Sequence, residues 1–125
     1  MAKDSVHTLL GHLLDAFLLT AVPLATESER QLNSNPRKLY PADPGLIRAF
    51  DPSGRANLGH ALETVVLNEA ERRRADVSYV KTADGLEVDF LLRHPGGTAE
   101  LVQVCADPTA NTTRARERRA LASAT

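Results

Sequence analysis

The chain has 125 residues, 42% of them hydrophobic and 25% charged, which is enough for one folded core and is not typical of a disordered protein. Its formal net charge of −1 excludes the strong overall positive charge of many nucleic-acid-binding proteins, so any basic patch must be local. The single cysteine, Cys105, excludes an internal disulfide and a zinc site built from several cysteines, and fits a reducing cytoplasm.

The chain begins with an amphipathic pattern. Apolar residues spaced three and four apart predict a helix, and they are Val6, Leu9, Leu10, Leu13 and Leu14. Asp4 or Ser5 is suited to cap it, because a short side-chain oxygen accepts the unpaired amide hydrogens there. The apolar run 17–22 fits either a buried strand or a continuation of the helix. Polar residues interrupt the segment 7–24 and no basic region precedes it, so we expect no signal peptide and no membrane span.

A polar, loop-rich stretch follows at residues 25–37. Residues 38–40 then predict a short strand, 41–45 a turn and 46–50 a short helical segment. The sequence Asp-Pro-Ser-Gly at 51–54 is the best candidate for a boundary between two parts of the chain.

The strongest predicted helix follows this boundary. Asn57 is suited to cap it, apolar residues lie along one side, and the arginines at 72–74 complement the helix dipole at its end. Residues 77–80 alternate as a half-buried strand does, and Asp84-Gly85 indicates a tight hairpin turn.

Two further strands and a last helix complete the pattern. We expect strands at 86–92 and 101–105, separated by a turn at 95–97, and a last helix that opens at Asp107 or Thr109. From Asn57 onward the predicted order is therefore helix, strand, strand, strand, helix.

Polar residues occupy particular places in this order. Glu63 lies on the helix, Asp89 on the second strand and Gln103 on the third. This arrangement resembles the PD-(D/E)XK nuclease superfamily, in which a helix glutamate, a strand aspartate and an acid-x-lysine pair hold Mg²⁺ beside the scissile phosphate. The resemblance implies that Glu63, Asp89 and Gln103 are the catalytic positions, with Glu63 and Asp89 as possible Mg²⁺ ligands.

The third-strand pair departs from the superfamily pattern. Gln103 keeps an oxygen but no charge, and Cys105 stands where the lysine belongs. Lys81, at the end of the preceding strand, is the candidate to replace that lysine, because superfamily members sometimes relocate it. Without such a replacement, cleavage is expected to be lost.

The resemblance narrows to one prokaryotic domain family of unknown function that follows an AAA-type ATPase module. The resemblance rests on short sequence segments that follow one another in the order found in that family. They lie along residues 5–122, at 14–19, 35–40, 43–46, 59–63, 87–90 and 101–105. This kinship implies an ATPase module in the full-length protein. This chain contains no Gly-x-x-x-x-Gly-Lys-[Ser/Thr] motif, so ATP hydrolysis is not assigned to these residues.

Simpler interpretations stand beside these. Glu87 shares a strand face with Asp89, and a solvated strand face explains it without a metal. His60 is expected to be a surface hydrogen-bonding residue, and Cys105 a small buried hydrophobic one. Arg114 and Arg118 on the last helix are the candidates for contacting a nucleic-acid backbone, although a solvated helix face also explains them.

We therefore expect an α/β fold with a restriction-endonuclease-like mixed sheet flanked by helices at 55–125. Residues 1–54 would form a helical appendage, with a winged-helix arrangement as one form it could take. The expected function is a cytoplasmic, degenerate nuclease domain that binds DNA or RNA or regulates its ATPase, with no membrane partner. Two alternatives stay open, a weak Mg²⁺-dependent nuclease and a protein-interaction module without nucleic acid.

Overall fold

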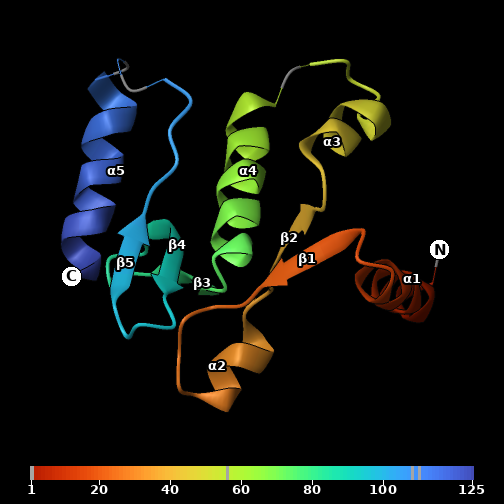
Figure 1. Cartoon of the computed structure of the whole chain (residues 1–125), viewed down its shortest axis with the longest axis horizontal. Coiled ribbons are helices and arrows are strands. Elements are labelled where there is room, and N and C mark those ends of the chain that lie inside the picture. The colour runs from red at the N-terminus through yellow and green to blue at the C-terminus, as the bar shows by residue number, and fades with distance from the viewer. Residues whose placement is uncertain (1, 56, 108, 110) are drawn as a thin grey trace.

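The computed structural model describes residues 2–55, 57–107, 109 and 111–125, and within them it has an α/β fold with five helices and two small antiparallel sheets (Figure 1). In chain order the elements are α1 Lys3–Asp15, β1 Leu19–Val22, α2 Glu29–Ser34, β2 Lys38–Pro41, α3 Pro44–Phe50, α4 Leu58–Arg72, β3 Asp76–Lys81, β4 Glu87–Arg93, β5 Ala99–Val102 and α5 Asn111–Ala124. No helix among the described residues has the length and apolar character needed to cross a membrane.

Helix α4 forms as its sequence predicts. The side-chain oxygen of Asn57 accepts a hydrogen bond from the backbone N–H of His60 at 3.2 Å, which confirms the expected N-cap. Leu67 and Ala70 lie on the buried side of the helix. The chain leaves the helix through Arg74, which has a positive φ of 60°.

Replacing Asn57 with Ala is expected to lower the free energy of unfolding by about 1 kcal/mol, because an amide hydrogen of the first turn loses its acceptor. Urea unfolding followed by circular dichroism measures this loss. Asn33→Ala, at an exposed position within α2, is the matched control and is expected to leave stability unchanged or slightly raised. Equal stabilities of Asn57→Ala and the wild type would contradict the capping role.

The larger sheet has the strand order β3-β4-β5, and its neighbouring strands are antiparallel. The Asp84-Gly85 turn joins β3 to β4 as expected, with Gly85 at a φ of 78° that favours glycine. Gly97, at a φ of 86°, occupies the turn between β4 and β5. The three strands expected after α4 are therefore present.

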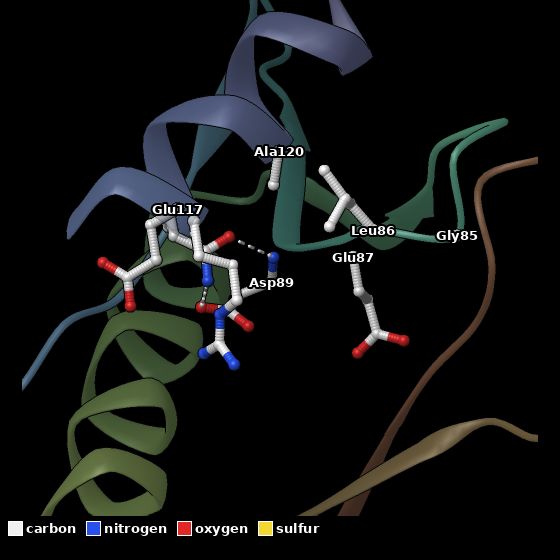
Figure 2. Close-up of a pocket in the computed structure, with 8 residues that line it drawn as sticks. Gly85, Leu86, Glu87, Asp89, Glu117 and Ala120 are labelled. Carbon is white, nitrogen blue, oxygen red and sulfur yellow. Dashed lines mark hydrogen bonds between the residues drawn. The ribbon is translucent and has the colours of Figure 1, made fainter. Parts of the chain in front are cut away.

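Helices cover both faces of this sheet. Helix α4 packs against β3 and α5 packs against β4, and the two helices lie on opposite sides of β4 (Figures 1 and 2). Consecutive residues Val88, Asp89 and Phe90 are all buried, as expected for a strand covered on both faces. Asp89 is thus a carboxylate inside the fold.

The smaller sheet is the β1-β2 pair, and it joins the same core. Val22 from β1 and Tyr40 from β2 are each 1% exposed and pack in one cluster with Leu67, Tyr79 and Phe90. A parallel bridge between Leu24 and Tyr79 connects the two sheets and is the only parallel pairing among the described residues. Residues before and after the loop at 51–54 therefore meet in a single hydrophobic core.

The structure corrects two expectations about the helices. Asp4 and Ser5 do not cap α1, because Ala2 has extended dihedral angles and the helix already begins at Lys3. Helix α2 forms where a loop was expected, since the hydroxyl of Ser28 accepts from the amide of Gln31 at 3.4 Å and starts a short helix.

The structure decides between the two alternatives for the run 17–22 and corrects the ends of two later elements. Phe17 adopts a φ of 57° after α1 and the chain continues as strand β1, so the strand alternative holds. Strand β5 ends at Val102 rather than at Cys105, so Gln103 and Cys105 follow the strand. The last helix begins at Asn111, later than the expected start at Asp107 or Thr109.

Candidate functional site

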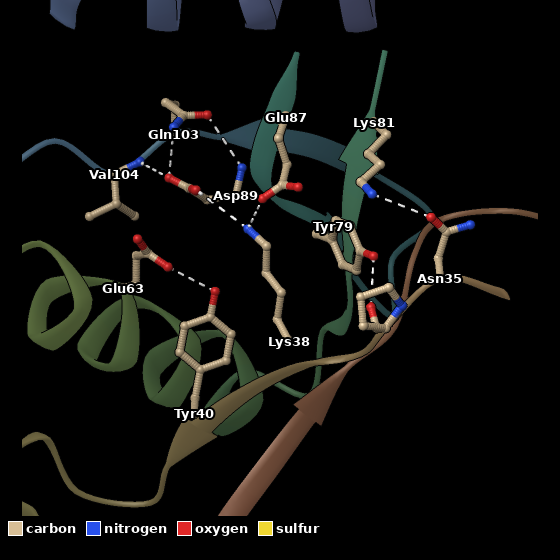
Figure 3. Close-up of polar contacts among 11 residues, drawn as sticks. Asn35, Lys38, Tyr40, Glu63, Tyr79, Lys81, Glu87, Asp89, Gln103 and Val104 are labelled. Atoms are coloured by element: carbon tan, nitrogen blue, oxygen red, sulfur yellow. Dashed lines mark hydrogen bonds and ion pairs between the residues drawn. The ribbon is translucent and has the colours of Figure 1, made fainter. Parts of the chain in front are cut away.

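Strand β2 directs two polar side chains into the protein. Lys38 and Tyr40 are two residues apart and share a face, whereas Leu39 between them points outward and is 36% exposed. Figure 3 shows both side chains rising from β2 toward Glu63 and Asp89. An ammonium group and a phenol thus reach the space between α4 and β4.

Tyr40 holds the glutamate of helix α4. Its hydroxyl donates to Oε2 of Glu63 at 2.8 Å, and its ring stacks on His60 with a centroid separation of 5.1 Å. Burial raises the pKa of Tyr40, and the hydrogen bond and negative charge of Glu63 raise it further. The phenol therefore stays protonated and acts as a permanent donor to the half-buried Glu63.

Asp89 is bound to the segment that leaves the sheet after β5. Its Oδ2 accepts from Nε2 of Gln103 at 2.8 Å and from the backbone N–H of Val104 at 2.9 Å. In return, the backbone N–H of Asp89 donates to Oε1 of Gln103 at 3.3 Å. The carboxylate thus satisfies polar groups where the β4–β5 ladder has ended.

Lys38 supplies positive charge to the two acids of β4. Its Nζ lies 2.6 Å from Oε1 of Glu87 and 3.8 Å from Oδ1 of Asp89. It also lies over the ring of Tyr79, 5.2 Å from the ring centroid, where a cation is attracted to the aromatic face. Its side chain is 24% exposed, so most of the side chain is buried.

The site is electrostatically strained around Asp89. Burial is the largest cause that raises the pKa of Asp89, and the charges of Glu63 and Glu87 raise it further, whereas Val104 and Lys38 lower it. A raised pKa means that Asp89 binds its proton more tightly in the folded chain than in the unfolded chain. The ionised carboxylate therefore opposes folding once the pH rises above 3.8, the ordinary pKa of an aspartate. The donors from Lys38, Gln103 and Val104 reduce this cost.

A pocket of about 370 Å³ lies on the α5 side of this site (Figure 2). Asp89, Glu87 and Gln103 line it from the sheet side, and Arg116 and Glu117 line it from α5. Glu63 is absent from its lining. The pocket thus brings Asp89 and Gln103 together, while Glu63 lies on the α4 side, bound to Tyr40 and close enough for its charge to act on Asp89.

The other expected positions lie as follows. Lys81 does not join the acids, because its Nζ donates to Oδ1 of Asn35 at 3.3 Å (Figure 3). Cys105 is half-buried, and burial and then a hydrogen bond with Glu117 raise the pKa of its thiol, which favours the unreactive protonated form. Arg114 and Arg118 are both exposed on α5 and lie one helical turn apart.

The donor set does not fit Mg²⁺. Among the described residues, no group of three or more His, Cys, Asp and Glu side chains is arranged to hold a metal ion. Mg²⁺ requires several oxygen ligands in near-octahedral geometry, but Gln103 turns its N–H rather than its oxygen toward Oδ2 of Asp89. The amide orientation is fixed, because the backbone N–H of Asp89 needs the Gln103 oxygen as its acceptor.

Sequence reasoning missed Lys38 and Tyr40 as members of the site. The available signal was the alternation in Lys38-Leu39-Tyr40, which places both polar residues on one face of the predicted strand. Nothing in the sequence indicated that this face packs against Glu63 and Asp89.

Comparisons with known proteins find no relative of this chain. The sequence matches no family model, and neither the curated proteins nor the solved structures give a significant match.

Proposed function

We propose that this chain is a degenerate nuclease-like domain that binds nucleic acid without cleaving it, within a protein that also carries an AAA-type ATPase module. The proposed fold kinship is with the restriction-endonuclease-like domains, and the proposed arrangement of the first 54 residues is a winged-helix-like appendage. The element order α4-β3-β4-β5-α5 supports this kinship, as do the positions of Glu63, Asp89 and Gln103 along it.

The observation that carries the loss of cleavage is the set of proton donors around the acids. Tyr40 donates to Glu63, whereas Gln103 and Val104 donate to Asp89. Metal-dependent phosphodiester cleavage needs carboxylate oxygens that are free to bind the ion. One oxygen of each acid, Oε2 of Glu63 and Oδ2 of Asp89, already accepts hydrogen bonds within the chain and is poorly suited to that role.

The proposed nucleic-acid contact lies on α5. Arg114 and Arg118 are exposed and one turn apart, and the same helix flanks the pocket at Asp89. Arginine binds phosphate oxygens through paired N–H groups, which gives affinity without reading the base sequence. The pocket itself is acidic, because Glu87, Asp89 and Glu117 outnumber Arg116 in its lining, so we place the phosphate backbone along the outer face of α5.

Fluorescence anisotropy with labelled single-stranded and duplex DNA and RNA, over a range of salt concentrations, tests this contact. Replacing both Arg114 and Arg118 with Ala is expected to weaken binding and to reduce the slope of log affinity against log salt by about 2. Arg30→Ala with Arg48→Ala removes the same charge from exposed positions on α2 and α3, away from α5 in Figure 1, and is expected to keep the slope.

Two outcomes would overturn the proposal. Cleavage of plasmid or single-stranded DNA with Mg²⁺ or Mn²⁺ that disappears in Asp89→Asn would establish the weak nuclease instead. Absence of salt-dependent binding to any of the nucleic acids would favour the protein-interaction module.

A further inference from the structure

The acids of this site already hold a cation that belongs to the chain. The ammonium group of Lys38 lies 2.6 Å from Glu87 and 3.8 Å from Asp89, and it also lies over the Tyr79 ring, 5.2 Å from the ring centroid. A lysine ammonium is a compact positive charge, so it can neutralise a pair of carboxylates from a central position as a bound metal ion would.

Neighbouring groups of the chain also occupy these acids. Tyr40 and Lys38 both come from β2, and one binds the helix acid while the other binds the strand acids. On the far side of Asp89, Gln103 and Val104 contribute two more N–H donors. Among the described residues, Oε2 of Glu63 and Oδ2 of Asp89 thus already accept hydrogen bonds from N–H and O–H groups of the chain itself.

The strand that carries Lys38 and Tyr40 is held firmly in the fold. Tyr40 is 1% exposed and packs in the core with Leu67 and Phe90, and β2 pairs along its whole length with β1. Lys38 lies two residues from Tyr40 on the same strand, so the backbone that carries it stays beside the acids while the core stays closed. A divalent ion would have to displace this group without moving the strand that carries it.

We propose that Lys38 is a built-in cation that takes the place of a divalent metal at Glu87 and Asp89 and excludes Mg²⁺ and Mn²⁺ from them. This inference rests on the proposed function in taking the site as kin to metal-dependent nucleases, and it gives a physical reason for the lost cleavage. Its test measures ion binding alone, so its failure is distinguishable from a failure of nucleic-acid binding.

Isothermal titration calorimetry and electron paramagnetic resonance with Mn²⁺ alone test the proposal on the intact chain. We expect the wild type to show no stoichiometric Mn²⁺ site. Lys38→Met, which keeps the length and apolar stem of the side chain, is expected to bind one Mn²⁺. Its affinity should be about tenfold or more above any weak Mn²⁺ binding that the wild type shows. That gain is expected to vanish in Lys38→Met combined with Asp89→Asn.

Lys81→Met is the matched control, because it removes the same charge from the end of the neighbouring strand β3, where Lys81 binds Asn35. It is expected to bind Mn²⁺ no better than the wild type. A wild-type Mn²⁺ site that Asp89→Asn abolishes would overturn the proposal, and so would a folded Lys38→Met that gains no Mn²⁺ binding.

A second measurement covers the case in which Lys38→Met fails to fold. In nuclear magnetic resonance spectra of the wild type, Mn²⁺ bound at Asp89 would broaden the backbone amide signal of Val104, which lies 2.9 Å from the carboxylate. We expect that signal to be no broader with Mn²⁺ than the amide signals of α2. Selective broadening at Val104 would show that a metal enters despite Lys38.

Discussion

Replacing Asp89 with Ala is expected to lower the free energy of unfolding by about 2–4 kcal/mol. The substitution leaves the N–H groups of Val104 and Gln103 without their acceptor, and each such buried donor costs about 1–3 kcal/mol. Relief of the cost of burying an ionised carboxylate offsets part of this loss, because burial raises the pKa of Asp89. Guanidinium unfolding, monitored by far-ultraviolet circular dichroism, measures the difference.

Glu87→Ala is the matched control for Asp89→Ala. Glu87 lies on the same strand and binds the same lysine, but its side chain is 40% exposed and water can replace its ion pair. We expect it to change the free energy of unfolding by less than about 1 kcal/mol. Equal losses in the two variants would contradict the view that Asp89 acts through its hydrogen bonds to the segment after β5.

The part of the fold from Asn57 onward was predictable because its signals are local. The cap at Asn57, the hairpin turn at Asp84-Gly85 and the order helix, strand, strand, strand, helix all follow from residues near one another in the chain. Helix α2 gave no such signal, since it is short and lies in a polar segment without an apolar stripe.

The site was only partly predictable, because its members meet through packing between distant segments. Glu63, Asp89 and Gln103 were expected to converge, and Asp89 with Gln103 does so directly. The end of β5 could not be placed from the apolar run at 101–105, because the strand stops where Asp89 replaces the ladder as hydrogen-bond acceptor for Val104.

The choice between two lysines shows the same limit. Lys38 and Lys81 both lie on short strands, and only Lys81 was considered from the sequence, because it ends the strand that precedes Asp89 and superfamily members sometimes relocate the lysine. The fold brings β2 across α4 and β4 instead, so that Lys38 reaches the acids and Lys81 reaches Asn35. Only the packing of the β1–β2 pair onto the larger sheet decides this.

Tyr40 offers the sharpest test of that packing. Tyr40→Ala is expected to lower the free energy of unfolding by about 3–5 kcal/mol, because it removes a fully buried aromatic ring from the core shared by β2, α4 and β4. Tyr40→Phe keeps the ring and removes only the donor to Glu63, and we expect a loss of about 1.5–3 kcal/mol, the range for hydrogen bonds to charged groups.

Tyr79→Phe is the control that separates the charged acceptor from the loss of a hydroxyl. Tyr79 is also 1% exposed, but its hydroxyl donates to the neutral backbone carbonyl of Pro36 at 2.8 Å. Tyr79→Phe is expected to lower the free energy of unfolding by about 0.5–1.5 kcal/mol, less than Tyr40→Phe does.

A double-mutant cycle tests the hydrogen bond itself. The effects of Tyr40→Phe and Glu63→Ala on the free energy of unfolding should not be additive, because the two residues share that bond. Independent effects of the two substitutions would mean that Tyr40 stabilises the fold through the packing of its ring alone and that its hydroxyl does not hold Glu63.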